Sequence, residues 1–151
     1  MITRLEADSI GEKEIDSEAY YGVQSLRANE NFPITGIPMH SELIKALAQL
    51  KRASAMTNRD SGRLDGIKSY AIIQACDEII EGKLYGQFIV DAIQGGAGTS
   101  ANMNANEVIA NHMHKKTSKV QSFGVIRKYL KNELCGAKNR CSVMIRTNSG
   151  L

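Results

Sequence analysis

Aromatic residues are scarce in this sequence. Tryptophan is absent and aromatic residues make up 5% of the 151 positions, so the core must be mostly aliphatic. The three cysteines, Cys76, Cys135 and Cys141, are an odd number without C-x-x-C spacing, which excludes a disulfide framework and a zinc-ribbon pattern. We therefore expect reduced thiols and a cytoplasmic protein.

Long apolar runs are also missing. Nowhere do about 18 consecutive apolar residues occur, as a membrane-spanning helix would need, and the first twenty residues contain no apolar segment of a signal peptide. The sequence therefore predicts no export and no association with a membrane. Its 42% hydrophobic and 23% charged residues are ordinary for a single globular domain of this length.

Acidic residues are nearly absent from the C-terminal quarter. Residues 1–114 hold 10 Lys and Arg against 15 Asp and Glu, whereas residues 115–151 hold 9 basic residues against Glu133 alone. We divide the chain accordingly into a domain, 1–114, and a basic tail, 115–151. Such a tail is a solvated segment, a nucleic-acid arm or a segment of separate origin. Only Phe123 and Tyr129 interleave with its charges, which disfavours nucleic acid and favours a solvated tail.

Helical periodicity predicts a mainly α fold with short extended or loop segments. In residues 41–59, Leu43, Leu47, Leu50 and Ser54 recur on one stripe, which Ile44, Ala46 and Ala53 widen, and this periodicity predicts a helix. Two helices of this kind are expected before residue 95.

The second helix is delimited by its end signals. Asp65 is a typical N-cap and Gly82 stands where a left-handed C-cap belongs. Its predicted buried residues are Ile72, Ala75, Cys76, Ile79 and Ile80.

Residues 88–94, FIVDAIQ, are too few for a helix and fit either an extended strand or a buried loop. A third helix is expected to begin near Thr99 or Ser100, because either residue is a good N-cap. Its candidate core positions are Met103, Val108 and Ile109. Upstream, residues 31–38, NFPITGIP, predict an ordered loop.

The stretch IQGGAGTSANMNANEVIAN, residues 93–111, resembles two phosphate-binding patterns and fits neither. Gly96-x-Gly98-x-x-Ala101 matches a dinucleotide-binding turn, but no acidic residue follows near Lys119, where such a turn needs one for the ribose. No Gly-Lys-Ser/Thr follows either, which excludes a P-loop.

What remains is a helix N-terminus with neutral donors. Backbone N–H groups, the Thr99 hydroxyl and several amide side chains suit a small carboxylate, especially one that gains charge in a transition state. Asparagine is a poor interior helix former, so four of them predict buried polar partners: Asn102, Asn104, Asn106 and Asn111. From the residues alone, a simple turn or a subunit contact explains the stretch equally.

These residues resemble a known family. IQGGAGTSANMNANEVIAN and GEKEIDSEAYYGVQSLRANENFPITG, residues 11–36, are similar to the aspartase/fumarase superfamily and, within it, to the aspartase branch. The fumarases of this fold typically carry Trp-Gln-Thr-Gly-Ser-Gly-Thr where this sequence has residues 94–100, QGGAGTS. The resemblance runs from about Glu6 to Asn111.

The resemblance implies a helical subunit of three domains in a homotetramer whose active sites are shared by three subunits. The implied activity is that of a carbon–nitrogen lyase, which eliminates ammonia from L-aspartate to give fumarate, with no cofactor and no metal. A base removes a Cβ proton and leaves an aci-carboxylate. Thr99, flanked by Gly98 and Ser100, is the implied substrate contact. Arg27 is a further candidate near the site, although we favour a structural, salt-bridged role for it.

Other family motifs are missing from these 151 residues. The family continues with a Ser/Thr-Thr-Asn-Asp motif, a Thr-His pair and a Gly-Ser-Ser loop whose serine is the base, and none of them occurs here. We therefore expect an N-terminal fragment without catalytic residues, inactive alone, whose basic tail arose by frameshift or rearrangement. The alternative is a non-catalytic module that binds a full-length lyase subunit or, through its tail, nucleic acid.

A zinc site is a weaker possibility in the sequence. His112 and His114 with Cys135 and Cys141 form a set of four ligand types, but their spacing fits no familiar zinc motif. Because alternate residues of a helix point to different faces, we expect the two histidines to be an ordinary pair.

Overall fold

The computed structural model describes residues 2–116 of the chain. The expectations for most of the basic tail, including Phe123, Tyr129, Cys135 and Cys141, lie outside the described residues. Within residues 2–116 the fold is mainly helical, as predicted. Its elements are β1 (Thr3–Ala7), β2 (Glu12–Asp16), α1 (Val23–Asn31), α2 (Ser41–Asp60), α3 (Gly66–Ile80), the short 3₁₀ helix η1 (Tyr85–Gln87) and α4 (Thr99–Lys116).

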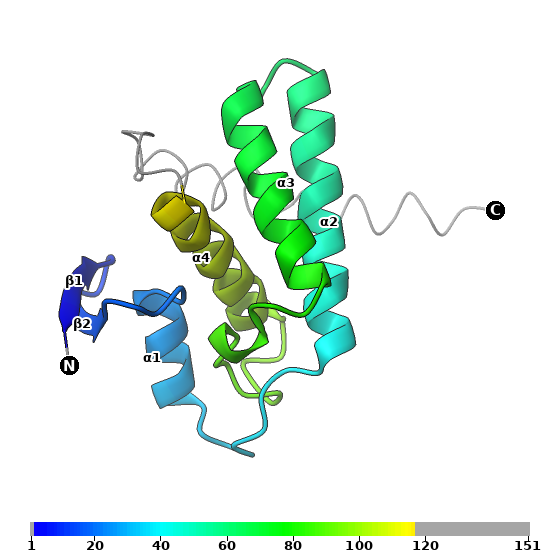
Figure 1. Ribbon diagram of the computed structural model, residues 1–151. Coiled ribbons are helices and arrows are strands. Elements are labelled where there is room, and N and C mark those ends of the chain that lie inside the picture. Colours follow the sequence, from blue (N-terminus) through cyan, green and yellow to red (C-terminus); the bar gives the residue numbers. More distant parts are fainter. Residues whose placement is uncertain (1, 117–151) are drawn as a thin grey trace.

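The helices are arranged around α4. Figure 1 shows α2 and α3 as a long antiparallel pair, with α4 between this pair and α1. The main core lies where α2, α3 and α4 meet, and Phe88 from the loop before α4 completes it. None of the described helices has the length and apolar character needed to cross a membrane.

The hairpin and α1 were not expected from the sequence. Strands β1 and β2 pair antiparallel with Thr3 opposite Asp16, and the Arg4 guanidinium donates to the carbonyl oxygens of Asp16, Ala19 and Tyr21. Helix α1 has no side-chain cap from its own sequence, which is why no local start signal indicated it. The expectation of two helices before residue 95 is therefore wrong.

The helix predicted over residues 41–59 is confirmed as α2, but its predicted apolar stripe is buried only in part. Ile44 of the stripe is buried and Leu47 packs half-buried against the core, whereas Leu43 and Leu50 are 48% and 53% exposed. The buried residues of α2 are Ile44, Ala48, Lys51 and Ala55. The pair α2 and α3 packs through small residues, and the Ser69 hydroxyl donates to the carbonyl oxygen of Ala55 at 3.1 Å. The leucine period therefore indicated the helix correctly, but close packing selected the face with the alanines.

The end signals of α3 are confirmed. The Asp65 carboxylate accepts the backbone N–H groups of Ile67 and Lys68, and Gly82 has a positive φ of 87°. Four of the five predicted core residues are buried and Ile80 is half-buried.

The loop reading of residues 88–94 is the correct one. Phe88 and Val90 are buried, and Asp91 forms an isolated bridge with Pro38 rather than a strand. In α4, Val108 and Ile109 are buried as predicted and Met103 is half-buried.

Candidate functional site

Two glycines shape the turn that leads into α4. Gly96 and Gly98 have φ values of 78° and 68°, a left-handed conformation that other residues adopt at a cost. Thr99 is the first helical residue, so Gly98 occupies the capping position. The prediction that this helix begins near Thr99 or Ser100 is confirmed, although Thr99 is its first helical residue and the residue before it is Gly98.

The first turn of α4 is suited to an anion. Thr99 is exposed and Ser100 is half-buried, and no acceptor within residues 2–116 receives their backbone N–H groups. The next N–H, that of Ala101, donates to Gln94 Oε1 at 2.7 Å. The first turn also carries no acidic residue. Two donors and the positive end of the helix dipole are therefore available at Thr99 and Ser100.

The asparagines of α4 tie this helix to other segments of its own chain. Asn104 Nδ2 donates to the Gln87 carbonyl oxygen at 3.0 Å, and Asn111 Nδ2 donates to that of Tyr20 at 2.8 Å. The predicted buried polar partners are confirmed for these two residues. Their role is to hold α4 in register against the loops around it.

Sequence reasoning missed a buried lysine on α2. Lys51 is 2% exposed, and its Nζ donates to Asn102 Oδ1, in the first turns of α4, at 2.7 Å. The available signal was its position, four residues before Ala55 and three after Ala48 on the face that packs inward.

The N-terminus of α1 is already occupied by a side chain. Glu107 of α4 is 2% exposed, and its carboxylate accepts the N–H groups of Gly22, Gln24 and Ser25 and the Ser25 hydroxyl. A carboxylate at a helix N-terminus satisfies its unpaired N–H groups and favours its dipole. The N–H groups at the start of α1 are therefore not available to a ligand.

Arg27 has a structural role, as favoured from the sequence. Its Nε lies 3.1 Å from Asp8 Oδ2, and its Nη2 donates to the Gly11 carbonyl oxygen at 3.0 Å. The guanidinium thus fastens α1 to the turn of the hairpin.

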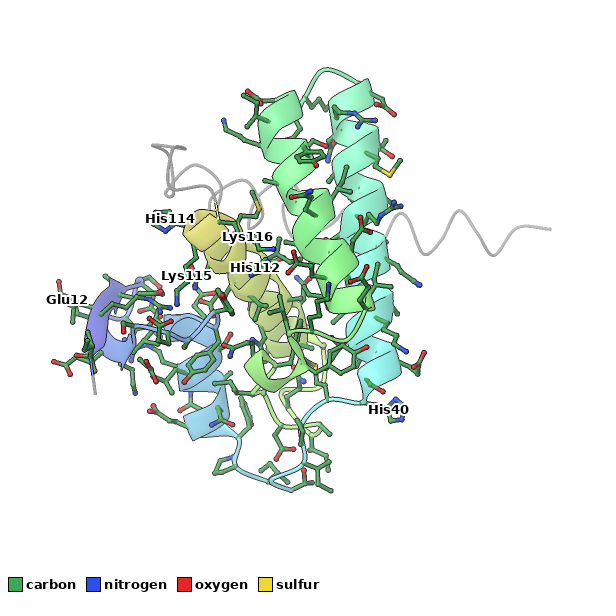
Figure 2. All side chains as sticks on the ribbon, viewed as in Figure 1. Glu12, His40, His112, His114, Lys115 and Lys116 are labelled. Atoms are coloured by element: carbon green, nitrogen blue, oxygen red, sulfur yellow. The ribbon has the colours of Figure 1, made fainter. Side chains whose placement is uncertain are left out.

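The far end of α4 carries a different cluster. Figure 2 shows His112, His114, Lys115 and Lys116 at the C-terminal end of the helix. His112 is buried, with Nε2 2.9 Å from Glu78 Oε2, while His114 is exposed, so the two histidines point to different faces as expected. Burial lowers the pKa of His112, which the nearby Glu78 partly opposes. Within residues 2–116, no three His, Cys, Asp or Glu side chains gather as a metal site.

Asp91 fixes the loop that precedes the glycine turn. Its carboxylate accepts the N–H groups of Thr35, Gly36 and Ile93 at 2.7–2.8 Å, and the Thr35 hydroxyl at 2.8 Å. Burial alone raises the pKa of this carboxyl, but the hydrogen bonds from Ile93, Thr35 and Gly36 outweigh it and lower the pKa to about 2.

Replacing Asp91 is expected to remove a pH-dependent part of the stability. Because the folded-state pKa lies below the ordinary value of 3.8, this stability is present above that value and is lost as the pH falls toward about 2. Urea unfolding should therefore give the wild type a higher free energy of unfolding than Asp91→Asn near neutral pH. This difference should shrink as the pH is lowered. A difference in the free energy of unfolding that is the same in acid and at neutral pH would contradict the low pKa of Asp91. Asp60→Asn, at the exposed end of α2, is the control.

Comparison with known proteins places these features in a family. The pattern of a family described as "Lyase" matches residues 11–125. The aspartate ammonia-lyase of Bacillus subtilis (strain 168) is 60% identical over 119 residues, which are 75% of this chain and 25% of that protein. The class II fumarate hydratase of Halobacterium salinarum is 51% identical over 108 residues, 72% of this chain and 23% of the relative.

A solved structure agrees with the sequence comparisons. The fumarate lyase:delta crystallin from Brucella melitensis bound to cobalt superposes with a TM-score of 0.77 at 44% identity, over 88% of this chain and 28% of that one. The chain therefore spans about a quarter of the length of the proteins that it matches.

Proposed function

The chain belongs to this lyase family, and on that basis we propose that it forms the first-domain part of an aspartate ammonia-lyase, which converts L-aspartate to fumarate and ammonia. The 60% identity to an aspartate ammonia-lyase supports this choice within a family that also includes a fumarate hydratase. The QGGAGTS form of residues 94–100 supports it as well. We further propose that the complete enzyme is a cytoplasmic homotetramer.

The proposal depends above all on the N-terminus of α4. The backbone N–H groups of Thr99 and Ser100 have no acceptor within residues 2–116, and no acidic residue lies in this turn. One carboxylate of the substrate accepts these N–H groups and the Thr99 hydroxyl, while Gly98 supplies the left-handed backbone that begins the helix.

The same arrangement of donors stabilises the transition state of the reaction more than it stabilises the bound substrate. When a base removes the Cβ proton, the adjacent carboxylate becomes an aci-carboxylate and gains negative charge. Donors that are already aligned stabilise this added charge without reorganising, so they contribute more to the transition state than to substrate binding. Neutral donors also hold the product carboxylate less tightly than a fixed cation would.

A dicarboxylate titration tests the site directly. We expect succinate, which cannot react, to shift the backbone amide resonances of Thr99 and Ser100 in the full chain. The neutral succinamide should leave them unchanged. Thr99→Val should weaken succinate binding about tenfold, because it removes one hydroxyl donor to a charged acceptor, and Thr57→Val on the exposed side of α2 is the matched control. The absence of any shift with succinate would contradict the proposed function.

A further inference from the structure

A buried histidine joins the last turns of α4 to two other segments. His112 is 4% exposed and lies one turn before the end of α4 (Figure 2). On one side, its Nε2 lies 2.9 Å from Glu78 Oε2 of α3. On the other side, its ring meets the Tyr20 ring edge to face, with the two centroids 5.0 Å apart. The imidazole therefore lies between α3 and the loop that precedes α1.

The surroundings of the His112 ring suit its neutral form. Within residues 2–116, neither ring nitrogen forms a well-aligned hydrogen bond, although Nε2 lies close to Glu78. A neutral imidazole has one N–H group and one bare nitrogen, whereas a protonated imidazole has two N–H groups, and each needs an acceptor. Protonation therefore places an N–H donor at Nδ1, which has no hydrogen-bond partner among the described residues. A buried donor without an acceptor destabilises the packed state.

The charges beside the ring offset this cost only in part. Glu78 faces His112 from α3, but its carboxylate also pairs with Lys116, the last residue of α4. The hydrogen bond from Lys116 lowers the pKa of Glu78, so this carboxyl stays ionised in weak acid. Burial of the ring lowers the pKa of His112, and the Lys116 ammonium acts in the same direction, although Glu78 opposes both.

The loop side of this junction carries its own ion pair. Lys115 Nζ lies 3.0 Å from Glu18 Oε2 and 5.0 Å from the centroid of the Tyr20 ring. Asn111 Nδ2 donates to the Tyr20 carbonyl oxygen at 2.8 Å and so holds this loop against α4. The charge of Glu18 is therefore matched by Lys115, and the group that the loop presents to His112 is the aromatic ring.

We propose that His112 makes the attachment of the end of α4 depend on pH. While the imidazole is neutral, the last turn of α4 stays packed against α3 and Tyr20. When the imidazole gains a proton, this turn separates from both, and the ion pairs of Lys115 and Lys116 are weakened with it. The inference is independent of the proposed function, because His112 and Thr99 lie at opposite ends of α4.

The pH range of this effect follows from the direction of the pKa shift. Because the folded-state pKa of His112 lies below the ordinary value of 6.5, the unfolded chain takes up the proton first as the pH falls. The stability that neutral His112 provides is therefore present above that value and is lost as the pH falls below it. The pH dependence due to Asp91 begins lower, below its ordinary pKa of 3.8, so the two effects are separable.

The first test follows the histidine ring resonances of the full chain by NMR as the pH is lowered. We expect the His112 ring to titrate at a lower pH in the folded chain than in the urea-unfolded chain. Glu78→Gln should lower the titration midpoint of His112 further, because it removes the carboxylate that favours the proton. A folded-state midpoint equal to or above that of the unfolded chain would overturn the inference.

The second test measures hydrogen exchange of the backbone amides in the last turn of α4, at about pH 7.5 and about pH 5.5. After correction for the intrinsic exchange rate, we expect the protection of these amides to fall about fivefold in acid, while that of α2 stays the same. His112→Gln cannot titrate and should show no such fall. His114→Gln is the matched control, since His114 is exposed on the same turn, and this variant should respond as the wild type does.

Each outcome of these tests decides the matter. Equal protection of the wild-type turn in acid and at neutral pH, or a fall that persists in His112→Gln, would overturn the inference. If His112→Gln does not fold, the ring titrations of the wild type and of Glu78→Gln provide the answer, and an unchanged His112 midpoint in Glu78→Gln would overturn it.

Discussion

The purified 151-residue chain is expected to convert L-aspartate to fumarate about a millionfold more slowly than the intact aspartate ammonia-lyase of Bacillus subtilis. The chain has the first turn of α4 to hold one carboxylate, but its sequence contains neither the Gly-Ser-Ser loop nor the Thr-His pair of the family. The catalytic groups of an active site act together, so the remaining groups accelerate the reaction very little when the base is missing.

The rise in ultraviolet absorbance as fumarate forms measures this directly. The Bacillus relative, assayed at the same subunit concentration, is the reference. A rate within a thousandfold of the relative would contradict the expectation. The variant Thr99→Val then shows which protein produces any residual fumarate. Activity of this chain should fall in the variant, whereas activity of a contaminating host enzyme should not change.

Glu107→Gln is expected to lower the free energy of unfolding by about 3 kcal/mol. The carboxylate accepts four hydrogen bonds at the start of α1, and Oε2 alone accepts those of the Gly22 and Ser25 N–H groups and the Ser25 hydroxyl. A glutamine has nearly the same size but replaces one oxygen with an NH₂ group, which then faces N–H donors in a buried place. The charge that favours the α1 dipole is lost as well.

Urea unfolding of the two proteins at neutral pH measures the difference, and hydrogen exchange locates it. The amides of α1 should lose protection in Glu107→Gln before those of α2 and α3, because the latter two helices pack mainly on each other. Glu18→Gln is the matched control, since the Glu18 side chain is 86% exposed and contacts Lys115 at the surface. A loss in Glu107→Gln no greater than in Glu18→Gln would contradict the capping role.

The sequence predicted the features that depend on neighbours along the chain. The cap at Asp65, the left-handed Gly82 and the helical periods of α2, α3 and α4 are all local, and the structure contains each of them. The lack of acidic residues in the first turn of α4, which suits this turn to an anion, could also be read from the sequence.

The features that escaped prediction depend on distant partners. Helix α1 begins where it does because Glu107, more than eighty positions later, caps it. Lys51 can be buried because its ammonium group donates a hydrogen bond to Asn102, which is distant in the sequence. From the sequence alone, a lysine in a leucine-rich helix is expected to be exposed. The stripe of α2 was only partly right for a related reason: small side chains that allow close helix packing outweigh larger ones, such as Leu43 and Leu50, that repeat with the right period.

The hydrogen bonds of α4 also set an order of events in folding. Its side chains reach back 51 residues to Lys51, 85 to Gly22 and 91 to Tyr20. On a ribosome these partners emerge long before α4 does, so the α2–α3 hairpin can pair early while α1 and the β-hairpin wait for their anchor. Contacts of such long sequence separation are slow to form because the intervening chain must first be closed into a loop. The N-terminal third is thus the first part to be made and the last to be fixed in place.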